Sequence, residues 1–168
     1  MSSEQTKLEQ ISKICRPQTG EDVPLVLFRA FRHFTADYVA QLLGKRATLV
    51  FQNGGRELGR EAGKLLKQES LDDYLRAVIG FVRDMRMGIL QPRELSDKAI
   101  ILGLEECLTC AGMDSIGKRI CHFETGFVAG IVESFLGNRV RAFESKCNAN
   151  GEGICEVTVD LTNTMTHE

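Results

Sequence analysis

The apolar residues of this chain change their spacing along the sequence, and this change limits the folds that the chain can adopt. Between residues 24 and 85 they recur at the three- and four-residue steps of amphipathic helices. Farther along, two pairs of segments predict β-hairpins, MGILQPREL with DKAIILGLEECL and NRVRAFESKC with ICEVTVDLT, and residues 120–136 between them predict another helix. This order predicts an α+β domain with an N-terminal helical half and a four-stranded, largely antiparallel sheet, in which two β-hairpins flank a helix.

Residues that start or stop helices set the expected helix ends. Pro24 suits the first turn of a helix, and Gly44 suits its end. Ser70 is a suitable N-cap for a helix over residues 71–85. Gly137 is placed to end the helix that lies between the two hairpins.

Glycines in two of the expected helices indicate close helix packing. In the helix expected over residues 46–66, Gly54-Gly55 predicts a kink or a break. Glycines four residues apart lie on one helix face, where they let another backbone approach closely. Two such pairs occur, Gly59 with Gly63 and Gly126 with Gly130.

Length and charge favour one domain and exclude some partners. With 168 residues, 43% of them hydrophobic, we expect a polar segment over 1–20, a single domain over 21–163 and a loose tail over 164–168. The net charge is −2 and no segment concentrates Lys and Arg, so nucleic acid is not expected as a direct partner. The N-terminus has no apolar signal core, and no stretch reaches the ~18 apolar residues of a membrane span. We therefore expect a soluble, cytoplasmic protein.

Four residues in the second half form a candidate metal site. Cys147 and Cys155 flank the loop NANGEGI, so pairing of their strands would bring them close, although spacing alone does not distinguish a disulfide from a metal site. Cys121 begins a helix, where the positive end of the dipole favours a thiolate. Glu144 can join the set only if its strand bulges or ends near Ser145, because residues three apart on a regular strand face opposite sides. Three sulfurs and one carboxylate suit tetrahedral zinc.

Two further cysteines leave other interpretations open. Cys107 and Cys110 form CLTC, a short motif that occurs in redox pairs and in metal sites. Cys107, Cys110, Cys121 and His122 are an alternative metal set by spacing, and an iron–sulfur cluster is a third alternative. Cys15 lies in the polar N-terminal segment and is expected to be a free thiol.

Histidine and aromatic residues have simpler explanations. His33 and His122 are expected to be partly buried and hydrogen-bonded rather than to act as ligands. No nucleotide-binding or hydrolase motif occurs in the sequence. A stripe of residues at four-residue steps is expected mainly to fill the core, although it could also line a pocket: Phe123, Phe127, Ile131 and Phe135.

The segment ECLTCAGMDSIGKRICHFETGFVAGIVESFLGNRVRAFESKCNANGEGICEVTV resembles the 4-vinyl-reductase domain, a small-molecule-binding module related in fold to haem NO-binding domains and to subunits of the Golgi-tethering TRAPP complex. The similarity is strongest over residues 107–161. It is looser over residues 24–66, where FRAFRHF and NGGRELGREAG resemble the helical half of the family. The resemblance implies a ligand-binding fold of the NO-signalling and Golgi-transport type, with a structural zinc at Cys121, Glu144, Cys147 and Cys155.

The resemblance also implies a function. Members of the family commonly form homodimers and bind a hydrophobic molecule, such as a hydrocarbon, between the helices and the sheet. The pocket residues expected here are Phe123, Phe127, Ile131, Ile100 and Ala142. Phenol is not implied, because Ile100, Thr125 and Ala142 stand where phenol sensors place Trp and Tyr. Any regulatory output is expected to pass through a protein partner.

Two alternatives to ligand binding follow from the same region. One is a cysteine-based redox sensor that uses Cys107 and Cys110. The other is an enzyme or accessory protein of tetrapyrrole metabolism. Catalysis is the weaker interpretation, since no nicotinamide or flavin motif is present and a zinc ion with four protein ligands has no open position. We therefore assign no catalytic residue.

Overall fold

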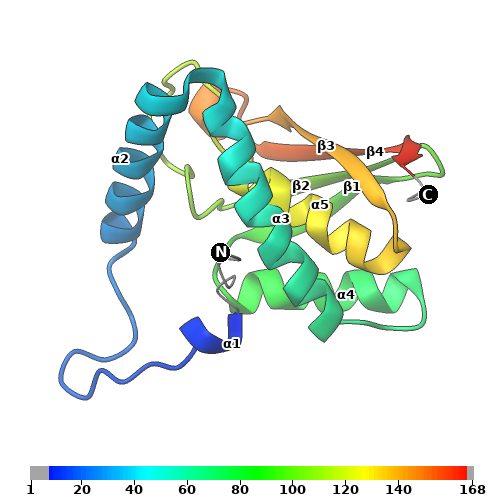
Figure 1. Ribbon diagram of the computed structural model, residues 1–168, viewed down its shortest axis with the longest axis horizontal. Helices are drawn as coiled ribbons and strands as arrows, with labels where there is room; N and C mark the ends of the chain where they lie inside the picture. Colours follow the sequence, from blue (N-terminus) through cyan, green and yellow to red (C-terminus); the bar gives the residue numbers. More distant parts are fainter. Residues whose placement is uncertain (1–7, 166–168) are drawn as a thin grey trace, which may run out of the picture.

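Helix α5 lies between the sheet and helix α3 in the computed structural model, which describes residues 8–165 (Figure 1). The helices are α1 (Leu8–Ile11), α2 (Leu25–Leu43), α3 (Ala47–Leu65), α4 (Leu71–Asp84) and α5 (His122–Leu136), with short 3-10 turns η1 (Gly44–Arg46) and η2 (Asn148–Asn150). The strands are β1 (Ile89–Leu95), β2 (Ala99–Glu105), β3 (Arg139–Lys146) and β4 (Cys155–Met165).

The four strands form one sheet in the order β1-β2-β4-β3, and every neighbouring pair is antiparallel. The two hairpins flank α5 in sequence and meet where β2 pairs with β4. Helix α5 packs against the sheet with ten buried residues, and α4 lies beside β1 (Figure 1). The predicted α+β architecture is therefore confirmed.

Several helix ends also agree with the sequence. Pro24 and Gly44 flank α2, and Gly137 caps α5 in the left-handed conformation at φ 76°. The side chain of Ser70 accepts a hydrogen bond from the amide of Asp73 at 3.1 Å, which caps α4. Each cap satisfies backbone groups that the helix itself leaves unpaired.

Two local details differ from what the sequence predicts. Helix α3 runs without interruption through Gly54-Gly55, because these glycines serve a helix contact and not a bend. An added Cβ at Gly55 would overlap the carbonyl oxygen of Phe123 on α5. Strand β4 continues to Met165, which pairs with Arg139, so the chain is still extended beyond residue 163. Residues 1–7 and 166–168, which include His167, lie outside the described residues.

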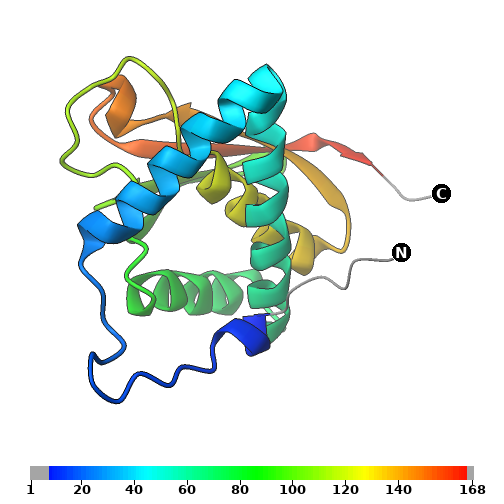
Figure 2. The same ribbon diagram turned by 60° about the vertical axis from the view of Figure 1, so that its left-hand side comes forward.

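Helix α2 lies at the edge of the molecule, beside the loop that follows β2 (Figure 2). None of its residues is buried, although much of its surface is apolar. The exposed apolar residues of this helix are Leu25, Val26, Leu27, Phe31, Phe34, Tyr38, Leu42 and Leu43. Among the described helices, none is both long and apolar enough to cross a membrane.

Candidate metal centre and ligand cavity

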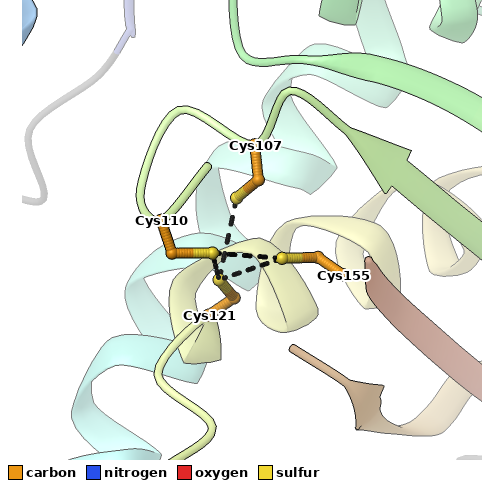
Figure 3. A group of neighbouring side chains, drawn as sticks. All are labelled: Cys107, Cys110, Cys121 and Cys155. Atoms are coloured by element: carbon orange, nitrogen blue, oxygen red, sulfur yellow. Dashed lines mark hydrogen bonds between the residues drawn. The ribbon is translucent and has the colours of Figure 1, made fainter. Parts of the chain in front are cut away.

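Five buried cysteines converge where the sheet meets the start of α5. Cys107 and Cys110 follow β2, Cys121 is the N-cap of α5, Cys147 follows β3 and Cys155 begins β4. Each is at most 3% exposed, whereas Cys15 is exposed. Figure 3 shows four of these side chains pointing toward one another from different segments. We call these five residues the cysteine cluster.

Cys121 is the centre of the cysteine cluster. Its Sγ lies 3.4 Å from that of Cys110 and 3.7 Å from that of Cys107. The Sγ atoms of Cys147 and Cys155 are each 3.8 Å from that of Cys121. A tetrahedral zinc site with Zn–S bonds of ~2.3 Å has S···S edges of about 3.8 Å. The observed separations therefore suit thiolates that share a metal ion.

The ligand atoms form two overlapping groups, each with all members within 4.8 Å of one another. One group consists of Cys107, Cys110, Cys121 and Cys155, and the other of Cys121, Glu144 and Cys147. The structure thus brings together three of the four residues expected to bind zinc, Cys121, Glu144 and Cys147. The fourth, Cys155, lies with the CLTC cysteines and touches Cys121 from there.

The sequence did not predict that Cys107 and Cys110 would join Cys155. The reason is strand register, because Cys155 pairs with Leu104 at the end of β2, just before Cys107. His122, named in the alternative metal set, is absent from both groups. Its Nδ1 atom lies 3.7 Å from Oε2 of Glu144 instead, and burial lowers its pKa.

Strand β3 is distorted as the glutamate ligand requires. The register between β3 and β4 shifts between Glu144 and Lys146, so the predicted bulge near Ser145 is confirmed. The shift lets Glu144 and Cys147 face the same point. Both carboxylate oxygens of Glu144 accept the amide N–H of Cys121 at 3.2 Å, and burial raises the pKa of Glu144 to about 9.

The buried thiols cannot all be thiolates unless a cation is present. Contact with Cys107 raises the pKa of Cys121, while contact with Cys110 lowers the pKa of Cys107. Cys155 also has a raised pKa, first through contact with Cys107. In the metal-free protein, some thiols therefore keep their protons and donate them to neighbouring sulfurs. A divalent metal would replace these protons and neutralise the thiolates.

Helix α2 holds the CLTC loop through three polar side chains. Arg29 donates to the carbonyl oxygens of Leu108 at 2.9 Å and Ala111 at 2.8 Å. The ring of His33 lies 3.1 Å from the carbonyl oxygen of Thr109, as expected for a hydrogen-bonded histidine. The loop that carries two cluster cysteines is thus attached to α2.

Arg32 forms the third connection and reaches the core. Its Nη2 lies 2.8 Å from Oε2 of Glu124, and both side chains are only 10% exposed. Thr109 donates to the other carboxylate oxygen of Glu124. Burial raises the pKa of Glu124, whereas Arg32 opposes this effect. The pair therefore couples α2 to the first turn of α5.

Two apolar cavities lie between the helices and the sheet. The larger has a volume of about 410 Å³ and is lined by α4, α5 and three strands, with Tyr74, Ile100, Val132, Phe135 and Leu161 among its residues. The smaller, about 30 Å³, reaches Cys121, Glu144 and Cys155 of the metal centre. Both cavities share the lining residues Val78, Leu102 and Ile131.

The expected pocket residues separate into two sets. Ile100 and Ile131 line the larger cavity, and Phe127 and Ile131 line the smaller one. Phe123 and Ala142 line neither of these two cavities. The ring of Phe123 faces Arg32, whose Cζ lies 5.8 Å from the ring centroid, and Ala142 packs against the core.

Sequence comparison relates this chain to archaeal proteins that are themselves uncharacterised. The protein MJ0150 of Methanocaldococcus jannaschii is 29% identical over 142 residues, which cover 84% of this chain and 78% of the relative. A second protein of that organism, MJ1642, is 24% identical over 152 residues, covering 90% of this chain and 86% of the relative.

Solved structures with low sequence identity share the fold. The trafficking protein particle complex subunit 3 of Naegleria fowleri has a TM-score of 0.65 at 14% identity, covering 85% of this chain and 98% of that chain. The phenol-responsive sensory domain of the transcription activator PoxR has a TM-score of 0.64 at 15% identity, covering 82% and 74%. A protein of the H-NOX family has a TM-score of 0.53 at 13% identity, covering 94% and 81%.

Two findings identify the family. A vinyl-4-reductase family protein of Methanocaldococcus jannaschii has a TM-score of 0.60 at 18% identity, covering 85% of this chain and 84% of that chain. The family model of the vinyl-4-reductase domain matches residues 100–161, a segment that contains α5, β3 and all five residues of the cysteine cluster. Through these residues, the chain belongs to the vinyl-4-reductase domain family, the 4-vinyl-reductase family that the sequence resembles.

Proposed function

We propose that this protein is a binding or sensing domain for a hydrophobic small molecule. The observation that carries the proposal is the cavity of about 410 Å³, whose lining is mostly aliphatic and aromatic. Ligand sites are commonly concave, mostly apolar and of this size range. Two proteins of the same fold support a small apolar ligand, since the PoxR domain was solved with phenol and the trafficking subunit was solved bound to palmitic acid.

A structural zinc ion at the cysteine cluster is the second part of the proposal. The ligands would be Cys121, Glu144, Cys147 and Cys155, which anchor the start of α5 to the β3–β4 hairpin. Three of them lie within 4.8 Å of one another, and Cys155 Sγ is 3.8 Å from Cys121 Sγ. A zinc ion would neutralise part of this buried charge and brace the smaller cavity that Cys121 and Glu144 line.

A homodimer is the third part, with α2 as its interface. Phe31, Phe34 and Leu42 are each at least 66% exposed on this helix, and contiguous apolar surface usually marks an interaction site. Polar side chains of α2, Arg29 and His33, hold the CLTC loop. A change at the cluster would therefore reach the interface and, through it, a regulatory partner.

One observation favours a redox sensor as a second candidate function. Cys110 Sγ and Cys155 Sγ lie 3.1 Å apart, closer than either lies to Cys121 Sγ, and both belong to the all-cysteine group. Under this hypothesis an oxidant converts two such thiols to a disulfide. Retention of bound zinc after mild oxidation, with every cluster cysteine still reduced, would reject it.

Ligand binding can be tested by filling the cavity from one strand. Ile100→Phe adds a ring where Ile100 lines the cavity, so we expect it to weaken binding of an apolar fluorescent naphthylamine probe at least tenfold. Ile101→Phe is the matched control, because neighbouring residues on β2 face opposite sides of the sheet. Fluorescence titration measures both variants. Equal binding by parent and both variants, or no saturable binding by the parent, would overturn the proposed cavity function.

A further inference from the structure

The cysteine cluster contains more ligands than one zinc ion can use. Five thiols and the Glu144 carboxyl make six candidate ligands, since the two groups share Cys121. A tetrahedral ion takes four ligands. The proposed zinc site leaves Cys107 and Cys110, both fully buried at 0% exposure, without a metal.

These two remaining thiols are placed as ligands and not as spectators. Cys107, Cys110, Cys121 and Cys155 have all their sulfurs within 4.8 Å of one another, so they form a complete four-thiolate set by themselves (Figure 3). Cys110 lies 3.4 Å from Cys121 and 3.1 Å from Cys155. Isolated structural thiols do not need such convergence, because a buried free cysteine packs as a small apolar residue.

We propose that the cluster binds two thiophilic divalent ions, with Cys121 and Cys155 as shared thiolates. The inference rests on the zinc site proposed above and adds a second ion held by Cys107 and Cys110. Two tetrahedral ions need eight coordination positions, and six ligands fill eight positions when two of them bridge. The shared pair has the required spacing, since Cys121 Sγ and Cys155 Sγ are 3.8 Å apart, close to the tetrahedral edge of about 3.8 Å.

The surroundings of the bridging thiolates suit this role. Cys121 touches the sulfurs of Cys107, Cys110 and Cys147, which come from both ligand groups. Asn148 donates its side-chain N–H toward Cys155 Sγ at 3.8 Å. Arg29 attaches the backbone of the CLTC loop to α2, which fixes the two ligands of the second ion. Such outer contacts orient metal ligands.

Metal stoichiometry tests the proposal. The full chain, purified under reducing and anaerobic conditions in zinc-containing medium, should hold two zinc ions per chain by elemental analysis and native mass spectrometry. Cys107→Ser and Cys110→Ser should each lower the value to one. The exposed Cys15→Ser is the matched control and should keep two. One zinc ion in the parent would overturn the second ion alone, whereas none would overturn the zinc site as well.

Two measurements on the parent protect the test against variants that fail to fold. In mild urea, which lets buried thiols open transiently, iodoacetamide should modify only Cys15 of the zinc-loaded protein, while a centre with one ion would also leave Cys107 and Cys110 reactive. Titration with Co²⁺ should give a high-spin paramagnetic signal that weakens as the second equivalent binds, because ions bridged by thiolates couple magnetically. A signal that doubles would show separate ions and overturn the sharing of Cys121 and Cys155. Acid-labile sulfide with bound iron would overturn the two-zinc centre in favour of an iron–sulfur cluster.

Discussion

Cys121 connects the helix, the sheet and the CLTC loop at the scale of a single residue. Its thiol contacts four other cysteines, and its amide donates to Glu144. Because it takes part in every proposed ligand set, its substitution would not separate one set from another. Cys147 is a better test of the zinc proposal, since it belongs to only one of the two ligand groups.

We expect Cys147→Ser to bind less zinc than the parent and to be less stable. Loss of a structural metal is among the changes that cost about 4 kcal/mol or more, which for a domain of this size lowers Tm by roughly 8–16 °C. Elemental analysis and calorimetry measure the two effects. Cys15→Ser, at an exposed position, should match the parent in both. A Cys147→Ser protein with unchanged zinc and Tm would contradict the assignment of this ligand.

Arg32 is the second residue whose effect can be isolated, because it is paired with a buried carboxylate. Arg32→Met should destabilise the protein by about 3 kcal/mol, since it leaves Glu124 buried without its cation. Addition of Glu124→Gln should recover most of that loss, because the remaining amide carries no charge. Urea denaturation of both single variants and the double variant measures the coupling. Additive effects would show that the pair is not coupled.

The contact between α3 and α5 dominates the helical layer at the scale of whole elements. Backbones approach closely there because glycines from both helices face the partner helix. A Cβ atom added at Gly59 would overlap the carbonyl oxygen of Phe127, and one at Gly126 would overlap that of Gln52. This contact positions the first turn of α5, and therefore Cys121, over the sheet.

Gly59→Ala should separate these two helices and destabilise the protein by about 1–3 kcal/mol, as overpacking does. Gly54→Ala is the matched control on the same helix, because its added Cβ would meet only the Phe123 ring at an ordinary 3.7 Å. Alanine is the better helix former, so the control should be stabilised by up to about 1 kcal/mol. Equal unfolding midpoints for both variants in urea would contradict the close crossing.

The molecule as a whole presents one exposed apolar helix, and the homodimer proposal depends on it. Phe34 on α2 and Leu65 at the end of α3 are each 76% exposed. We expect Phe34→Glu to shift the protein to monomer at micromolar concentration, because a charge would be buried at the interface, while Leu65→Glu leaves the dimer unchanged. Sedimentation equilibrium measures both. A monomeric parent, or a Phe34→Glu variant that remains dimeric, would contradict α2 as the interface.

Local patterns explain why much of the fold was predictable. The order of helices and strands follows from hydrophobic spacing, and the caps at Ser70 and Gly137 follow from chemistry within a few residues. The bulge near Ser145 was also predictable, because Glu144 and Cys147 can face one point only if the strand is distorted. The break at Gly54-Gly55 was wrong, since nothing within the helix distinguishes a bend from a packing contact.

The sequence by itself determined the α+β order and the distortion that Glu144 requires, because each depends on periodicity or on neighbours along the chain. Only the tertiary structure decided that Cys107 and Cys110 meet Cys121 and Cys155, and where the large cavity lies. Those features depend on the register of β2 with β4 and on the path of the loop to α5. Such long-range contacts are set by the packing of distant segments, which local spacing does not encode.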